Sequence, residues 1–447
     1  LSEEGWLDCT VEARTARLKA ALERRESPRG SLSSEARRTL SVFQAIAHCR
    51  RKYGPNSIGP YIVSMAHGPD DVLSVLLLAR WGDLAPKGAA VPLDVVPLFE
   101  TVEDLENAST IMERLLTDEI YRSHLEHRGS HQMIMIGYSD SNKDGGLAAA
   151  RWTLHNAQRG LVATLEKFGV ELTLFHGRGG TVSRGGGRLH EAILASPRGA
   201  VAGRLRMTEQ GEMINAKYGL RAIAMRSLEQ TVSSVLSVTA KPYNPPKSAV
   251  KWREIMGEIA AASREAYKDM IYDRVEFPVY FRHATPIDVI ERLGIGSRPS
   301  SRGDDDSLTE LRAIPWVFAW TQSRFILPGW FGLGAGLQHA WDKYGEQALR
   351  DMLAEWYFFR VLISDTEVVL GKVDVAIAER YSQLAGPLHE KFFPPIRAEH
   401  DRCVDLLLKV TGQEKLLERE DTLRRAIRLR NPYVDPMSLL QVNLLKR

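Results

Sequence analysis

The chain has 447 residues, with 59 basic and 56 acidic side chains and a formal net charge of +3. Such a balanced charge argues against a dedicated nucleic-acid-binding protein, which normally carries a marked basic excess. No apolar run of about 18 residues occurs, so the sequence predicts no membrane-spanning helix. The cysteines Cys9, Cys49 and Cys403 are widely spaced and form neither a metal motif nor a disulfide framework. We therefore expect a cytoplasmic protein with no nucleic-acid or membrane partner.

The first part of the chain has the pattern of two helices. Residues 11–25 and 35–54 both carry apolar side chains at the spacing of an amphipathic helix, and a Ser/Pro/Gly-rich linker joins them. The sequence therefore predicts a helical segment over residues 1–54.

The next part alternates short apolar runs with helix-like segments. This alternation is typical of parallel β/α units, which place polar chemistry at the carboxyl ends of their strands. We therefore predict a β/α part over residues 55–220. The four runs are residues 61–66, 95–100, 133–140 and 170–177, and they carry Ser64, Glu100, Asp140 and His176 at or near their ends.

Beyond about residue 220 the apolar spacing is helical, which predicts a mostly helical third part over 221–447. The Gly/Pro/Asp-rich stretch 296–307 is typical of a loop. The aromatic stretch 314–332 is broken by Pro328 and Gly329, and we expect its tryptophans to form buried core around a turn.

Residues 175–188, "FHGRGGTVSRGGGR", combine six glycines with three arginines and one histidine. A disordered RGG-type tail would lack the strand that precedes this stretch and the helix that follows it. A dinucleotide-binding fingerprint requires a different glycine spacing. The pattern favours an anion-binding loop, because glycines let backbone N–H groups approach an oxyanion that arginines bind.

The stretch 137–146, "GYSDSNKDGG", places Asp140 and Lys143 after a strand. One interpretation is a surface ion pair. Another is a metal site, because Asp140 and Glu100 would supply two carboxylates at one edge of the sheet, as Mg²⁺ or Mn²⁺ prefers. Arg298 and Arg312 are further candidates for binding an anion.

Several long motifs recur in the order of the bacterial-type phosphoenolpyruvate carboxylase family, which the chain resembles from about Ile62 onward. The resemblance implies an α/β barrel of that type, predominantly α-helical, present here as a partial barrel with a C-terminal helical bundle. It implies a homotetramer that joins bicarbonate to phosphoenolpyruvate, giving oxaloacetate and phosphate in anaplerotic carbon fixation. The motifs are "MIMIGYSDSNKDGG", "LFHGRGGTVSRGGG", "RMTEQGEMINAKYG", "FRHATP", "GSRP", "LRAIPWVFAWTQSR" and "RNPYVDP".

The resemblance also implies roles for single residues. It implies Mg²⁺ or Mn²⁺ at Glu100 and Asp140, catalytic roles for Lys143, His176 and Arg184, and substrate binding by Arg178, Arg298 and Arg312. The loop residue Arg184 is expected to hold the bicarbonate-derived group. With Lys372 and Arg430 it is also expected to bind a dicarboxylate inhibitor, aspartate, which would draw Arg184 out of the active site.

The chain departs from the family pattern in a few places. No Thr-Ala-His-Pro setting for the family's upstream catalytic histidine occurs, so we expect a C-terminal portion that is inactive alone. Ser183 stands where glycine is usual, and Arg188 where proline or another residue is commoner. The main alternative is a non-catalytic relative that binds phosphoenolpyruvate or dicarboxylates. Another phosphoenolpyruvate-dependent lyase or kinase would need a phosphohistidine loop or a nucleotide site, and neither was found.

Overall fold

The structure is a computed structural model that describes residues 5–28, 30–85, 89–242, 246–293, 299, 301 and 308–446. The chain forms two compact units, each described by itself. Unit 1 consists of Leu1–Gly137, Asn156–His176 and Gly199–Met207, and unit 2 of Tyr138–His155, Gly177–Arg198 and Thr208–Arg447.

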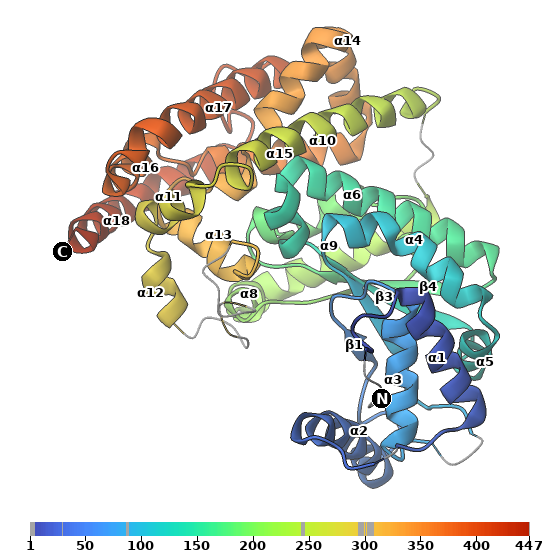
Figure 1. Ribbon diagram of the computed structural model, residues 1–447. Helices are drawn as coiled ribbons and strands as arrows, with labels where there is room; N and C mark the ends of the chain where they lie inside the picture. Colours follow the sequence, from blue (N-terminus) through green and yellow to red (C-terminus); the bar gives the residue numbers. More distant parts are fainter. Residues whose placement is uncertain are drawn as a thin grey trace. The chain divides into compact units, whose positions relative to one another are not determined.

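A five-stranded sheet with the order β1-β2-β3-β4-β5 organises unit 1 (Figure 1). The register pairs Tyr61 with Val95, Leu98 with Met135 and His176 with Met207, in parallel in each case. Every residue of β2 is buried, as expected for a parallel strand covered on both faces. The strands are β1 (Tyr61–Val63), β2 (Val95–Phe99), β3 (His131–Gly137), β4 (Glu171–Gly177) and β5 (Arg206–Met207).

Side-chain caps mark where the helices of unit 1 begin. The Thr10 hydroxyl accepts a hydrogen bond from the Ala13 N–H at 3.2 Å, and Thr101 and Asp104 form a reciprocal capping box. The helix α3 packs against α1, α2 and β2. The helices are α1 (Val11–Arg24), α2 (Ser34–Tyr53), α3 (Pro69–Trp81), α4 (Val102–Thr117) and α5 (Glu119–His127).

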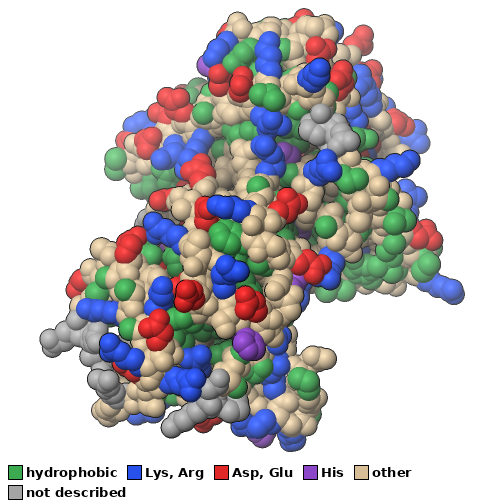
Figure 2. Space-filling model, turned by 90° about the vertical axis from the view of Figure 1, so that its right-hand side faces the viewer, with side chains coloured by type: hydrophobic (Ala, Val, Ile, Leu, Met, Phe, Trp, Pro, Cys, Tyr) green, Lys and Arg blue, Asp and Glu red, His purple; other side chains and the backbone are tan. Residues whose placement is uncertain are grey.

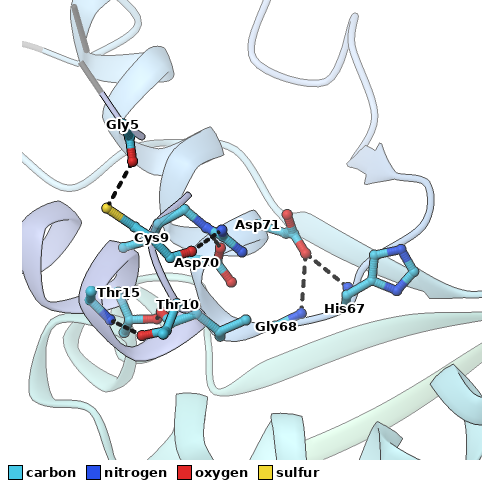
Figure 3. A network of polar contacts seen from close by, with 11 residues as sticks. Gly5, Cys9, Thr10, Thr15, His67, Gly68, Asp70 and Asp71 are labelled. Atoms are coloured by element: carbon cyan, nitrogen blue, oxygen red, sulfur yellow. Dashed lines mark hydrogen bonds and ion pairs between the residues drawn. The ribbon is translucent and has the colours of Figure 1, made fainter. Parts of the chain in front are cut away.

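A polar network ties α1 to the start of α3 (Figure 3). Arg14 Nε donates to Asp70 Oδ2 at 2.6 Å, and Asp71 Oδ2 accepts from the backbone N–H groups of His67 and Gly68 at 2.8 and 3.1 Å. A Cβ at Gly68 would lie 2.4 Å from Asp70 Oδ1 and 2.7 Å from Val11 Cγ1, so a larger residue would displace these side chains. The network thus fixes the loop between β1 and α3.

Unit 2 is almost entirely helical in the residues described. In it α14 packs between α10 and α17 (Figure 1). The long helix α6 (Ser139–Lys167) begins in unit 2 and is interrupted at Gly146, which has φ +78°. The other elements are η1 (Val182–Arg184), α7 (Leu189–Leu194), α8 (Gly211–Tyr218), α9 (Arg221–Ala240), α10 (Ala249–Ile271), α11 (Phe277–Ala284), α12 (Ile287–Arg292), α13 (Ala313–Gln322), η2 (Leu327–Gly329), α14 (Leu333–Glu355), α15 (Tyr357–Leu370), α16 (Val375–Ser382), η3 (Gln383–Ala385), α17 (Leu388–Thr411) and α18 (Asp421–Leu445).

The aromatic stretch 314–332 forms buried core, as predicted. Trp316, Trp320 and Trp330 are each at most 1% exposed. The rings of Trp316 and Trp320 meet edge to face, with their centroids 5.5 Å apart. The turn at Pro328 and Gly329 lies in the short helix η2.

The structure corrects two predicted strand ends. The third strand stops at Gly137, and Asp140 lies in the first turn of α6, because the Asn142 N–H donates to the Tyr138 carbonyl at 3.2 Å and starts the helix. The first strand stops at Val63, because Met65 adopts φ +53°. The helices predicted over 11–25 and 35–54 are confirmed as α1 and α2.

The mostly helical character and the parallel sheet agree with the expected fold class. In the described part of the chain, β1 and β5 are the edge strands of the sheet. Closure into a barrel and the segment boundaries at residues 54 and 220 stay predictions. No helix in the described residues is both long enough and apolar enough to span a membrane. Basic and acidic side chains are interspersed on the face shown in Figure 2.

Candidate active site

The predicted site residues belong to both units. Glu100 and His176 belong to unit 1, and Arg298 lies outside the described residues. The remaining predicted residues belong to unit 2 and are Asp140, Lys143, Arg178, Arg184, Arg312, Lys372 and Arg430.

Glu100 follows β2 and is held in one position. Its side chain is 7% exposed, and its Oε2 accepts a hydrogen bond from the Met65 N–H at 2.9 Å. A Cβ at Gly137 would lie 3.0 Å from Glu100 Cα, so the neighbouring strand must end in glycine here. The result is a buried carboxylate at the carboxyl end of the sheet.

Asp104 connects this strand end to His67. Its Oδ2 accepts from the Glu100 N–H at 3.3 Å, and its Oδ1 lies 2.6 Å from His67 Nδ1. The hydrogen bond to Asp104 raises the pKa of His67 above its usual value. Burial alone would raise the pKa of Asp104, but the hydrogen bonds from His67 and Thr101 lower it overall. The sequence analysis did not identify this pair, because the capping box of Thr101 and Asp104 gives no sign of the distant contact with His67.

His176 is the second-last residue of β4 and lies opposite Met207 of β5. It is 5% exposed. Its place on the strand agrees with the sequence prediction. The buried imidazole therefore lies at the carboxyl ends of the strands, as Glu100 does.

Lys143 is buried in the first turns of α6 and is 6% exposed. Its Nζ lies 3.5 Å from the Thr309 carbonyl oxygen, and its own carbonyl accepts from the Tyr272 hydroxyl at 2.8 Å. Lys143 is therefore not a solvent-exposed surface lysine. Asp140, three residues earlier, is partly exposed.

Asn142 lies between these two residues and is 2% exposed. In the described part of the chain, neither its Oδ1 nor its Nδ2 has a hydrogen-bond partner. An unsatisfied buried polar group costs about 1–3 kcal/mol, so such groups call for an explanation. A ligand that pairs with this amide would remove the cost, and the sequence analysis did not single out Asn142.

The glycines of the loop at 177–188 serve close packing. A Cβ at Gly185, which has φ +81°, would lie 2.5 Å from Tyr138 Cδ1, and one at Gly179 would lie 2.6 Å from Arg184 Cβ. The N–H of Gly186 donates to the Thr181 carbonyl at 2.6 Å. Larger side chains would therefore force the loop away from its neighbours.

Arg178 and Arg184 are buried within this loop, at 7% and 3% exposure. Arg178 Nη2 donates to the Gly186 carbonyl at 3.3 Å, and its guanidinium lies 5.6 Å from the centre of the Tyr138 ring. Burial lowers the pKa of Arg178, and the positive charge of Arg151 adds to this effect. Such a guanidinium gains from an anionic ligand.

Arg151 and Asp365 fasten the loop, and the sequence analysis missed both. Arg151 Nη2 donates to the carbonyls of Val182 and Gly186, each at 3.3 Å, and to Asp365 Oδ2 at 3.1 Å. Burial raises the pKa of Asp365, while the nearby Arg151 opposes that shift. No sequence signal could have linked a single arginine in α6 to an aspartate in α15.

The remaining predicted cations lie on other elements of unit 2. Arg312 immediately precedes α13 and is partly exposed. Burial lowers the pKa of Lys372, and the charge of Arg430 adds to the effect, so the fold brings these two residues near each other. Arg324 is also close to Arg430 and forms an ion pair with Asp435 at 2.5 Å.

Unit 1 thus contains a buried carboxylate and a buried histidine, and unit 2 contains buried cations. Among the described residues, no cluster of three or more His, Cys, Asp or Glu side chains could hold a metal by itself. Two carboxylates with water and an anionic substrate are nevertheless a common donor set for Mg²⁺ or Mn²⁺.

The profile of the phosphoenolpyruvate carboxylase family matches residues 2–447. The chain belongs to this family. It is 52% identical over 408 residues to a phosphoenolpyruvate carboxylase of Xanthomonas campestris pv. campestris strain 8004, covering 91% of this chain and 45% of the relative. It is 42% identical over 430 residues to that of Bradyrhizobium diazoefficiens, covering 94% of this chain and 46% of the relative.

A relative from Chlamydomonas reinhardtii is also similar over most of the chain. Phosphoenolpyruvate carboxylase 2 of Chlamydomonas reinhardtii is 43% identical over 431 residues, which cover 93% of this chain and 35% of the relative. The chain therefore spans less than half the length of these curated relatives. The family assignment confirms the resemblance inferred from the motifs.

Proposed function

We propose that the chain is the C-terminal portion of a phosphoenolpyruvate carboxylase and supplies much of its active site. The reaction joins bicarbonate to phosphoenolpyruvate and yields oxaloacetate and inorganic phosphate. The family membership and the retained motif residues support this proposal. The observation that carries it is that Lys143, Arg178 and Arg184, three cations of the family motifs, are all buried in unit 2, where a positive charge acts strongly on an anionic substrate.

The chemistry explains why cations gather in this unit. A bicarbonate oxygen attacks phosphorus and the bond from phosphorus to the enolate oxygen breaks, which gives carboxyphosphate and the enolate of pyruvate. The carboxyl group then forms a bond to carbon 3 of the enolate, and phosphate leaves. Negative charge is present throughout, and fixed positive groups stabilise it as it shifts.

Each site residue has a proposed part in these steps. Arg178, together with Arg298 and Arg312, binds the phosphate and carboxylate of the substrate. His176 donates to a phosphate oxygen, Lys143 stabilises the developing charge, and Arg184 holds the bicarbonate-derived group.

Glu100 and Asp140 would hold the divalent cation, Mg²⁺ or Mn²⁺. Their carboxylate oxygens are the hard ligands that these ions prefer, and the burial of Glu100 suits a fixed ligand. When bound, the ion supplies positive charge that polarises oxygens of the substrate. The hydrogen bond from Met65 orients the Glu100 carboxylate for that role.

The loop at 177–188 would keep water from the enolate, which water would otherwise protonate. Lys372 and Arg430, with Arg184, are the proposed site of a dicarboxylate inhibitor such as aspartate. A homotetramer, a cytoplasmic location and inactivity of the isolated chain belong to the same proposal.

The test is an assay of oxaloacetate formation by the 447-residue chain and by a longer chain that includes the upstream region. We expect bicarbonate- and Mn²⁺-dependent turnover by the longer chain and none by the shorter one. Lys143→Ala in the longer chain should reduce kcat by at least about 10³-fold, because it removes a buried charge at the reacting groups.

The matched control is Lys251→Ala, which removes an exposed lysine on α10 and should leave kcat unchanged. Full activity of Lys143→Ala would refute the site assignment. Binding of phosphoenolpyruvate by the longer chain without turnover would instead identify a non-catalytic relative.

A further inference from the structure

Unit 2 contains a cavity that the proposed reaction does not use. It has a volume of about 710 Å³ and is lined by the end of the glycine-rich loop, by α14 and α15, and by the segment that joins α17 to α18. Ligand sites commonly occupy about 300–1,000 Å³. None of the residues assigned to the active site or to the inhibitor site lines it.

The acidic side chains of the cavity are already engaged. Arg188 donates to Glu191 Oε1 at 2.9 Å and also pairs with Glu420. Glu367 Oε1 accepts from the Leu417 N–H at 2.5 Å and from the Gln413 amide at 3.2 Å. Glu191 and Glu420 are thus paired with Arg188, whereas Glu367 keeps its charge and interacts electrostatically with Arg419.

Arg360 and Arg419 are held by backbone carbonyl groups. Arg360 donates from Nε to the Leu353 carbonyl at 3.1 Å and from Nη2 to that of Ala354, both in the last turn of α14. Arg419 Nη2 donates to the Thr411 carbonyl at the end of α17, at 2.9 Å. Within the part of the chain described, neither arginine forms an ion pair. Each guanidinium carries five N–H donors, so donors remain for a ligand.

The rest of the lining suits the organic part of a small metabolite. Leu353, Val361 and Val410 supply apolar surface, and Tyr357 lies beneath the Arg360 guanidinium, which is 4.9 Å from its ring centre. A ligand can therefore place charged oxygens at the arginines and carbon atoms against these side chains.

Arg188 connects the cavity to the loop of the active site. It directly follows Gly187 of that loop, where a Cβ would lie 2.6 Å from Asp365 Oδ1, so the loop end is closely packed. Glu420 immediately precedes α18, the helix that carries Arg430. An anion in the cavity would compete with Glu420 for Arg188, because both are negatively charged.

We propose that this cavity binds a small dianion, whose charge lies on phosphate or carboxylate groups, through Arg360 and Arg419. The bound anion draws Arg188 from Glu420 and loosens the loop that holds Arg184. Binding stands independently of the reaction, whereas its effect on turnover rests on the proposed function.

Calorimetric titrations of the chain with inorganic phosphate and with succinate test the binding. At least one probe should bind at the cavity, and which one does identifies the charged group. Arg360→Gln and Arg419→Gln should each weaken that binding at least tenfold. The variant Arg178→Gln distinguishes binding in the cavity from binding at the active site. The matched control is Arg397→Gln, which changes an exposed residue of α17. Circular dichroism verifies that each variant is folded.

Hydrogen exchange of the Gly185 and Gly186 amides tests the link to the loop. Exchange should quicken at least threefold when the cavity is filled, and Glu420→Gln should produce the same change without a ligand. Binding unaffected by both arginine substitutions would overturn the proposed site, and unchanged exchange would overturn the link. Neither measurement needs turnover, so an inactive enzyme would count against the proposed function alone.

Discussion

The buried charges of the candidate site are held by opposite parts of the backbone in the two units. In unit 1, backbone N–H groups donate to carboxylates, as Met65 does to Glu100 and His67 does to Asp71. In unit 2, a backbone carbonyl accepts from a cation of the site, as that of Gly186 does from Arg178. Both arrangements keep a charge in place without cancelling it, because a peptide group carries no net charge.

The difference bears on the ligands that each unit can take. Carboxylates held by N–H groups keep their negative charge for a cation, whereas arginines held by carbonyls keep their positive charge for an anion. Most ion pairs on the protein surface, such as that of Lys409 with Asp405, cancel their charges and contribute little. Four substitutions or pH changes, from the largest expected effect to the smallest, test this contrast.

Arg151→Met should cause the largest loss. It leaves Asp365 buried without its cation and frees two loop carbonyls, which should destabilise unit 2 by about 3–5 kcal/mol. Hydrogen exchange of unit 2 helices under native conditions measures this. The double variant Arg151→Met/Asp365→Leu leaves no unpaired charge and should recover most of the loss. If the single variant Arg151→Met is as stable as the parent chain, Arg151 does not hold the loop in place as we describe.

Acid should destabilise unit 1 through His124, which is 7% exposed in α5. Burial lowers its pKa from 6.5 to about 4. The unfolded chain therefore takes up a proton below pH 6.5 before the folded chain does, and stability falls as the pH decreases from about 6.5 to 4. The expected loss is about 3 kcal/mol.

Thermal or urea unfolding, monitored by hydrogen exchange of the α5 amides at several pH values, measures this loss of stability. His124→Gln should flatten the dependence over that range, and His127→Gln, at an exposed position on the same helix, should not. An equal pH dependence in the His124→Gln variant would show that other groups cause it.

Gly185→Ala tests whether glycine is needed for packing rather than for mobility. It introduces a Cβ at positive φ and 2.5 Å from the Tyr138 ring, and should cost about 2–3 kcal/mol. Gly345→Ala has a similar φ of +80° but open space around it, so only the backbone strain of about 1 kcal/mol should remain. Equal effects in thermal unfolding would argue against close packing of the loop.

Arg14→Met should have the smallest effect. The Arg14 side chain is 24% exposed, and water can partly replace it beside Asp70, so we expect a loss of about 1 kcal/mol. Chemical unfolding of unit 1 measures it, with Arg24→Met at a 74% exposed position as control. A loss as large as that of Arg151→Met would show that the Arg14–Asp70 ion pair stabilises the protein as much as the Arg151–Asp365 pair does.

The sequence could predict the helices α1 and α2, because their apolar spacing and caps are local. It could place Glu100 and His176 at the ends of strands for the same reason. It extended the third strand three residues too far, because the turn to α6 depends on a hydrogen bond from Asn142 to Tyr138 rather than on composition.

The sequence by itself determined the family, the candidate residues and the order of strands and helices, since these depend on motifs and on local periodicity. Only the tertiary structure decided that the loop glycines make room for Tyr138 and Arg184. It alone paired Arg151 with Asp365, which lie 214 positions apart in the chain. Such contacts depend on the packing of distant segments, which no local pattern of residues specifies.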